Sequence, residues 1–266
     1  MIETMAVKAP DGVDSAVRYA GTDGPALVFV HGVGSTAAIW DRQLDAFSGA
    51  YRTLAIELRG NGVPKPEPDP RAITRAGYAD DVLAALDALR VDRATIVGCS
   101  LGGVVAFELW ERASERIEAM VILGSFAAYP NARAYADGIC SAVRAAGTMD
   151  MFARERAARL GAMPPDRLRE TLDQMASKSV ASYLAATEAT WTGDYRAMLA
   201  TIDVPALVCT GENDVIAPPA LSREIADGIP DSEFALIPHA GHVANADNPE
   251  AFNELVRRFL ARAAVG

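Results

Sequence analysis

The segment 94–112, ATIVGCSLGGVVAFELWER, decides how the rest of the chain is interpreted. It carries the pattern G-x-S-x-G, from Gly98 to Gly102, directly after an apolar run of strand length and directly before a helical pattern. A sharp strand-to-helix turn holds such a serine in a strained conformation above a sheet edge, and the glycines let the flanking backbones pass closely. We therefore predict that Ser100 is a nucleophile. The alternative is a glycine-rich turn whose serine has no chemical role.

Further apolar runs of strand length alternate with amphipathic helical patterns along the chain. The runs cover residues 26–30, 53–58, 94–98, 120–124, 206–210 and 233–238, and the helical patterns cover 36–47, 78–89, 101–112, 219–229 and 249–264. Runs that are apolar on both faces indicate strands buried in a parallel sheet. Residues 5–9 and 16–20 flank a Pro-Asp-Gly turn and predict an antiparallel hairpin at one edge. The sequence therefore predicts an α/β fold with a mostly parallel, doubly wound sheet.

Residues 129–201 interrupt this alternation, because they have helical composition and no convincing strand. Helices are expected over 133–145, 150–161, 166–177 and 179–190, with breaks at Gly147 and 164–165. We interpret this stretch as an inserted helical cap, or lid. The core domain would then consist of residues 1–128 and 202–266.

A serine nucleophile needs a base, and the chain offers only three imidazoles, His31, His239 and His242. His239 and His242 lie in PHAGHVANADNPE, after the last predicted strand, where a loop can reach over the edge of the sheet. His242 lies deeper in this loop and is the predicted base. His239 is the fallback, interpreted as a hydrogen-bonding spacer at the strand end whose replacement should mainly perturb packing.

The imidazole in turn needs a carboxylate that orients it and stabilises its cation. The loop GENDVIAPP follows the strand at 206–210 and places Asp214 beyond a tight turn at the same sheet edge. Glu212 is the alternative acid in that loop. The loop after the preceding strand reads Gly124-Ser125-Phe126 and offers no carboxylate. The predicted catalytic residues are thus Ser100, Asp214 and His242.

Composition excludes several other classes of function. The chain has 266 residues, 50% of them hydrophobic, with 25 Lys and Arg against 35 Asp and Glu, a net charge of −10 that opposes binding to nucleic acid. No segment approaches the about 20 apolar residues of a membrane span, and the first residues lack the pattern of a secretory signal. The three cysteines are scattered and form no zinc or disulfide pattern, and Cys99 is interpreted as a small packed residue. We expect a cytoplasmic protein with no metal, and a homodimer is left open.

The chain resembles the α/β-hydrolase superfamily in the segments HGVGSTAAIW, ELRGNG, VGCSLGG, GENDVIAPP and HAGHVANADNPEAFN, which occur in the order and spacing of that family. The last segment and the stretch RAAGTMDMF are most similar to the 3-oxoadipate enol-lactonase and carboxylesterase group. Glu57, Asn61 and Val63 stand where relatives usually have Asp, often have His and commonly have Ser. The resemblance implies a hydrolase without a cofactor.

The same resemblance implies an oxyanion hole formed by the backbone N–H groups of Val33 and Leu101. His31 would then be a buried, hydrogen-bonded residue of the oxyanion loop. Phe126 and Trp191 are candidate substrate contacts, although core packing explains both equally well. A dianionic substrate would need arginines of the cap to offset the net charge, and three such residues are Arg133, Arg144 and Arg154.

These observations predict a serine hydrolase that cleaves a small carboxylic ester, lactone or enol-lactone through an acyl-enzyme. Three alternatives use the same fold: a carbon–carbon bond hydrolase, a perhydrolase or acyltransferase, and a ligand-binding protein without turnover. A 3-oxoadipate enol-lactone is the substrate that the resemblance to the enol-lactonase group implies.

Overall fold

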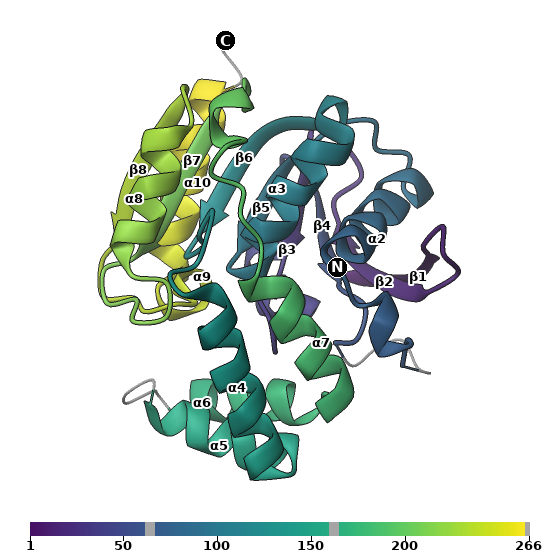
Figure 1. Ribbon diagram of the computed structural model, residues 1–266. Coiled ribbons are helices and arrows are strands. Elements are labelled where there is room, and N and C mark those ends of the chain that lie inside the picture. Colours follow the sequence, from purple (N-terminus) through teal and green to yellow (C-terminus); the bar gives the residue numbers. More distant parts are fainter. Residues whose placement is uncertain (62–66, 160–164, 264–266) are drawn as a thin grey trace.

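The computed structural model describes residues 1–61, 67–159 and 165–263, and its helices and strands alternate as predicted (Figure 1). The strands are β1 Glu3–Lys8, β2 Asp14–Ala20, β3 Ala26–Val30, β4 Arg52–Glu57, β5 Ala94–Cys99, β6 Ile117–Leu123, β7 Ala206–Gly211 and β8 Ser232–Ile237. The α-helices are α1 Asp41–Phe47, α2 Arg75–Ala88, α3 Leu101–Ala113, α4 Ala132–Ala146, α5 Met149–Arg159, α6 Pro165–Ala176, α7 Val180–Trp191, α8 Pro219–Gly228, α9 Ala244–Asp247 and α10 Pro249–Ala263.

All the strands form one sheet, in the order β1-β2-β4-β3-β5-β6-β7-β8. The strands from β4 to β8 along this order pair in parallel, whereas β1 and β2 form the predicted antiparallel hairpin at one edge. Parallel strands end at the same edge, so the loops that follow β3, β5, β7 and β8 lie close together. The predicted mostly parallel sheet is confirmed.

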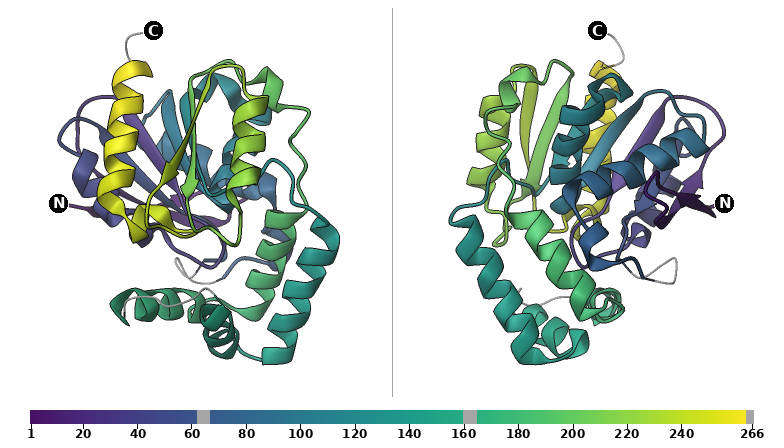
Figure 2. Two further views of the ribbon diagram at one scale, coloured as in Figure 1. Left: turned by 90° about the vertical axis from the view of Figure 1, so that its left-hand side faces the viewer. Right: turned by 45° about the vertical axis from the view of Figure 1, so that its right-hand side comes forward.

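Helices cover both faces of the sheet, as a doubly wound fold requires (Figure 2). In β3, Val28 and Val30 point into the core shared with α2, α3 and α8, whereas Leu27 and Phe29 point into the core shared with α1 and α10. This alternation is the two-residue period of a strand whose two faces are both buried. Every residue of β3 is buried, which explains why its sequence is apolar without a polar face.

Helices α4 to α7 lie between β6 and β7 in the chain and below the sheet in Figure 1. They share a small core of their own, in which Val143, Phe152, Met175 and Tyr183 are buried. Val33, from the loop after β3, packs against this core. The helices are therefore in direct contact with the edge of the sheet where the strands end.

Two local features differ from the sequence predictions. The helix expected over 36–47 begins as a 3-10 turn at Ala37–Trp40 and becomes α-helical only at Asp41. The buried carboxylate of Glu57 accepts the N–H of Ala37, at the start of the 3-10 turn, at 3.0 Å. Helix α9 was not predicted, since its four residues are too short to show a helical period. Val63, the break at residue 164 and the ends of the helices expected over 150–161 and 249–264 lie outside the described residues.

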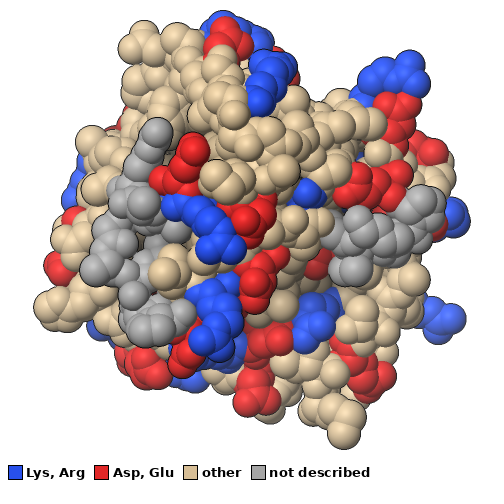
Figure 3. Space-filling view, turned by 90° about the horizontal axis from the view of Figure 1, so that it is seen from below, with Lys and Arg blue, Asp and Glu red and all other residues tan. Residues whose placement is uncertain are grey.

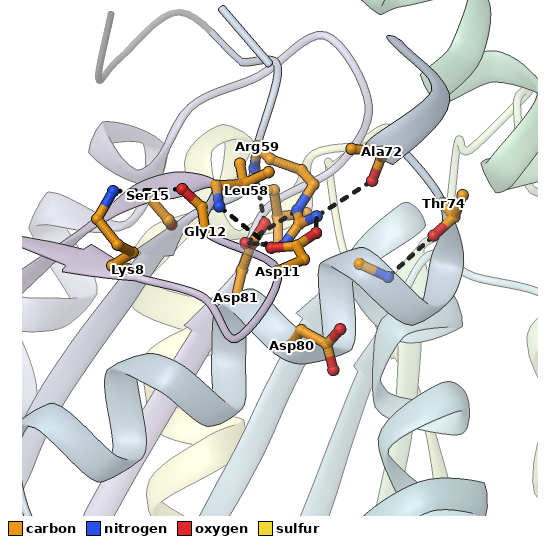
Figure 4. Close-up of polar contacts among 12 residues, drawn as sticks. Lys8, Asp11, Gly12, Ser15, Leu58, Arg59, Ala72, Thr74, Asp80 and Asp81 are labelled. Carbon is orange, nitrogen blue, oxygen red and sulfur yellow. Dashed lines mark hydrogen bonds and ion pairs between the residues drawn. The ribbon is translucent and has the colours of Figure 1, made fainter. Parts of the chain in front are cut away.

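A buried arginine connects the β1–β2 turn to the sheet edge (Figure 4). Arg59, just after β4, is 1% exposed. Its guanidinium donates to the carboxylate of Asp81 on α2 at 2.9 and 3.0 Å, and to the carboxylate of Asp11 in the turn. It also donates to the carbonyl of Ala72 at 3.2 Å. A buried guanidinium needs such partners, because an unpaired buried charge is costly.

Candidate active site

Ser100 lies at the turn between β5 and α3, in the conformation that the G-x-S-x-G pattern predicts. Its φ is +55° and its ψ is −114°, values that side-chain-bearing residues rarely adopt. Its N–H donates to the carbonyl of Leu123 at 2.9 Å, and its carbonyl accepts the hydroxyl of Ser125 at 2.8 Å. Backbone contacts on both sides thus maintain the strained turn. The hydroxyl of Ser100 has no hydrogen-bond partner among the described residues.

The glycines of the pattern are required by close backbone approach. A Cβ at Gly98 would lie 2.2 Å from the carbonyl oxygen of Gly102, and a Cβ at Gly102 would lie 2.1 Å from that of Val30. Contacts this short cannot be accommodated without moving the backbone. The close passage of the flanking backbones that the pattern predicts is therefore present at both glycines.

Asp214 and His242 are joined by a hydrogen bond of 2.8 Å between Oδ2 and Nδ1. The other carboxylate oxygen of Asp214 accepts the N–H groups of Ile216 and Ala217, both at 2.9 Å, and the residue is 4% exposed. Gly124 packs against the pair, because a Cβ there would lie 3.1 Å from Oδ2 of Asp214. The carboxylate is therefore fixed by its own loop, and it orients the imidazole.

The other two histidines occupy different environments. His31 is fully buried, with Nδ1 2.8 Å from the carbonyl of Gly32 and Nε2 accepting the N–H of Leu58, as predicted for a loop residue. The side chain of His239 is 90% exposed, and its backbone N–H donates to Glu212 at 2.7 Å. The expectation that His239 contributes mainly packing is wrong, because its ring lies in solvent. Glu212 is engaged in this loop contact, away from His242.

The loop after β3 approaches Ser100 closely. A Cβ at Gly32 would lie 3.2 Å from Cβ of Ser100, so this loop and the serine turn are in contact. The N–H of Val33 has no backbone hydrogen bond among the described residues, and the N–H of Leu101 begins α3, where intrahelical partners are absent. Both donors thus lie on the two segments that meet at Ser100. The adjoining Ser35 donates to Gln174 of α6 at 2.8 Å.

A cavity of about 690 Å³ opens beside these residues. From the edge of the sheet it is lined by Gly32, Val33, Ser100, Asn213, His239 and His242, and from α5 to α7 by Arg156, Asp166, Glu170, Thr171, Gln174, Met175 and Trp191. This volume suits a small molecule. The structure thus brings Ser100 and His242 to one cavity, with Asp214 hydrogen-bonded behind the imidazole.

The two aromatic candidates differ in their access to the cavity. Trp191 lines it, whereas Phe126 does not appear among the described residues that do so. Phe126 is 1% exposed and stacks on Trp191 with ring centroids 5.0 Å apart and an interplanar angle of 12°. Tyr129 and Tyr135 also pack against Trp191. The structure therefore gives Phe126 a packing role behind Trp191.

The arginines considered for an anionic substrate lie away from the cavity. Arg133 pairs with Glu188 and Arg154 pairs with Asp150, both on the exposed surface, and Arg144 is exposed. The surface seen from the side of α4 to α7 mixes basic and acidic side chains (Figure 3). Arg156 and Arg42 line the cavity instead. Sequence reasoning missed Arg156, although its spacing from the buried Phe152 and Ala153 indicates the inward side of α5.

The described residues contain no helix long and apolar enough to cross a membrane. They also contain no group of three or more His, Cys, Asp or Glu side chains arranged to hold a metal ion.

The fold and the arrangement at the sheet edge define an α/β hydrolase. A family model described as the alpha/beta hydrolase fold matches residues 25–249, and the chain belongs to this family. The predicted superfamily is thereby confirmed, and the chain is a hydrolase.

Individual relatives agree with this assignment. The chain is 28% identical to 3-oxoadipate enol-lactonase 2 of Acinetobacter baylyi, over 94% of each chain. It is 30% identical to RutD of Azorhizobium caulinodans, named as a proposed carbamate hydrolase, over 89% of this chain and 91% of that one. Among solved structures, a hydrolase from Pseudomonas aeruginosa superposes with a TM-score of 0.88 at 30% identity, over 97% of this chain and 98% of that one.

Proposed function

We propose that this chain is a serine hydrolase that cleaves a carboxylic ester or a lactone, including an enol-lactone, through Ser100, His242 and Asp214. The observation that carries the proposal is the 2.8 Å hydrogen bond between the buried Asp214 and His242, whose imidazole lines the same cavity as the strained Ser100. A serine hydroxyl is a weak nucleophile until a base accepts its proton, and an oriented imidazole is such a base.

In the first half of the reaction, His242 takes the proton of Ser100 while Oγ attacks the substrate carbonyl. The carbonyl oxygen becomes an oxyanion, and the N–H groups of Val33 and Leu101 stabilise it. Each such donor typically lowers the barrier by about 3 to 4 kcal/mol. Asp214 stabilises the imidazolium that forms. His242 then gives its proton to the leaving oxygen, the carbon–oxygen bond breaks, and an acyl-serine remains.

The second half repeats these steps with water as the nucleophile. His242 takes a proton from water, the hydroxide attacks the acyl carbonyl, and the same two N–H groups stabilise the second oxyanion. His242 returns the proton to Oγ of Ser100 as the acid leaves. For a lactone, the leaving oxygen stays attached to the acyl group, so one product carries both the acid and the alcohol or, from an enol-lactone, the ketone. We also propose that residues 129–201 act as a cap over this cavity.

The enol-lactonase relative supports the lactone within this proposal. The relative named as a proposed carbamate hydrolase supports a second candidate, cleavage of a carbamate by the same residues. Both reactions pass through a tetrahedral oxyanion, so the arrangement at Ser100 serves either. Carbon–carbon bond cleavage and transfer to peroxide or an alcohol remain alternatives on the same three residues.

Replacement of Ser100 by alanine tests the proposal. Ser100→Ala should lower kcat for p-nitrophenyl esters and lactones by at least about 10³-fold, because loss of a nucleophile removes the acyl-enzyme route. A fluorophosphonate probe should label the unaltered chain at Ser100 and leave the variant unlabelled. Ester turnover retained by a folded Ser100→Ala variant would refute the assignment. Faster turnover of lactones than of linear esters would select the lactone.

A further inference from the structure

Arg156 is a cation on the inward side of a helix that otherwise buries apolar residues there. Helix α5 buries Met149, Phe152 and Ala153, and Arg156 follows these at the three- and four-residue spacing that keeps side chains on one helix face. Arg156 is half-buried and lines the cavity that Ser100 and His242 also line. Arg154, two positions earlier on the same helix, is 62% exposed.

The positive charge of Arg156 acts on two tyrosines near the cavity that Ser100 and His242 line. Burial raises the pKa of Tyr129, and the positive charge of Arg156 opposes this shift. Burial likewise raises the pKa of Tyr183, and Arg156 again opposes it. Tyr129 donates to the carbonyl of Ile216, beside the Asp214 loop, whereas Tyr183 packs against Gly34 of the oxyanion loop.

No hydrogen bond or ion pair joins Arg156 to another residue in the part of the chain that the structure describes. The neighbouring arginines contrast with it, because Arg133 pairs with Glu188 and Arg154 with Asp150. A half-buried guanidinium gains most from a planar anion that accepts two of its N–H groups. A carboxylate has this shape.

Acidic residues restrict where such an anion can bind. Asp166, Glu170 and Asp247 also line the cavity. Glu170 accepts Nε2 of Gln174 at 3.2 Å, and Asp247 accepts the N–H of Gly241 at 3.0 Å. With a chain net charge of −10, an anion is repelled unless a local cation compensates.

We infer that Arg156 binds a carboxylate group of the substrate, so that the enzyme prefers esters or lactones that carry an acid over neutral ones. The inference rests on the proposed hydrolase function, since it assigns the specificity of that same cavity. Arg156 is a specificity-determining residue in this scheme and takes no part in the proton transfers. The reacting carbonyl lies at Ser100 while the distant acid of the same molecule lies at Arg156.

The test compares two substrates of equal length, the mono-p-nitrophenyl ester of adipic acid and the same ester with its acid converted to a primary amide. The unaltered enzyme should favour the acid, and Arg156→Gln should reduce kcat/KM for the acid by about 10- to 100-fold, the factor that a charge-assisted hydrogen bond represents. Turnover of the amide should remain within about two-fold, because neutral substrates do not use the charge. Arg156→Lys should retain part of the preference.

Arg154→Gln is the matched control, because it removes a charge from the same helix but outside the cavity. It should leave the acid-to-amide ratio unchanged. Equal kcat/KM for acid and amide in the unaltered enzyme would overturn the inference, as would a ratio that persists in Arg156→Gln. If Arg42→Gln abolished the preference for the acid over the amide while Arg156→Gln kept it, the carboxylate would bind at Arg42. That result would also overturn the inference.

A binding measurement separates this inference from the proposed function. Calorimetric titration of adipate into Ser100→Ala requires no turnover. Weaker binding to Ser100→Ala/Arg156→Gln than to Ser100→Ala/Arg154→Gln would support the carboxylate site even if both esters proved to be poor substrates. Equal binding to the two variants would refute the site, whereas loss of ester hydrolysis alone would refute only the reaction.

Discussion

The cavity has two walls that are built in different ways. On the wall formed by the edge of the sheet, Ser100 and Asp214 are 2% and 4% exposed, and backbone hydrogen bonds fix both. On the wall formed by the helices, α5 and α6 pack around a separate small core and present charged side chains such as Arg156 and Glu170. The residues of the first wall belong to the loops of the sheet, whereas those of the second belong to helices α4 to α7, which lie below the sheet in Figure 1.

This difference assigns different roles to the two walls, proton transfer to the first and substrate recognition to the second. Proton transfer needs groups held to within about 0.5 Å of the productive geometry, which buried turns at strand ends provide. Recognition of the remote part of a substrate tolerates looser placement, and exposed helical positions can change without disturbing the sheet. We therefore expect substitutions on the sheet wall to reduce turnover of all substrates and those on the helical wall to change which substrates are preferred.

The two histidines of the last loop give the largest expected contrast. His242→Ala should lower kcat by at least about 10⁴-fold, because the proposed base is lost. His239→Ala should change it by less than about three-fold, since an exposed side chain at the cavity mouth holds no reacting group. Steady-state kinetics with a p-nitrophenyl ester measure both, and circular dichroism confirms that each variant folds. A larger loss for His239→Ala would show that the other imidazole is the base.

The buried ion pair between Arg59 and Asp81 allows an effect on stability to be distinguished from an effect on catalysis. Asp81→Asn should reduce the free energy of unfolding by about 3 to 5 kcal/mol, because it leaves the buried Arg59 without one of its two acidic partners. Asp80→Asn, one residue earlier on α2, breaks a more exposed pair with Arg112 and should cost less than about 1 kcal/mol. Urea denaturation measures both changes.

In the same variants, kcat below the unfolding transition should remain within about two-fold of the unaltered enzyme, because the hydrogen bonds of Asp81 among the described residues all join it to Arg59 and none to Ser100 or His242. A fall in kcat that is larger for Asp81→Asn than for Asp80→Asn would show that the network around Arg59 also orders the sheet wall. Equal losses of stability in the two variants would contradict the importance of burial.

Local patterns in the sequence predict the sheet wall well. The strained turn at Ser100 follows from G-x-S-x-G between a strand and a helix, and the positions of Asp214 and His242 follow from their places after β7 and β8. The exposure of His239 was not predicted, because its φ of +56° turns the chain away from the strand, a conformation that a histidine does not signal.

The contacts of the helical wall depend on pairs that are distant in the chain, and sequence patterns do not show these. Ser35 and Gln174 of α6, which form a hydrogen bond, are 139 residues apart in the chain. Arg156 was detectable in principle from its spacing on α5. What distinguishes it from Arg133, Arg144 and Arg154 is their pairing or exposure, which only the structure shows.

The hydrogen bond between Ser35 and Gln174 joins the two walls and gives the smallest expected effect. Gln174→Ala removes the acceptor that holds the oxyanion loop, so the N–H of Val33 should be less well placed and kcat should fall by about three- to ten-fold, within the net value of one hydrogen bond. KM should change less than kcat, because the donor acts on the oxyanion that forms in the transition state. Gln174→Glu keeps an acceptor and should restore most of the rate.

Ser35→Ala should cause the same loss as Gln174→Ala, and the double variant should be no slower than either single variant, since both substitutions remove the same interaction. Additive losses of kcat would mean that Ser35 and Gln174 act separately. The hydrogen bond between the two walls would then not position the oxyanion loop.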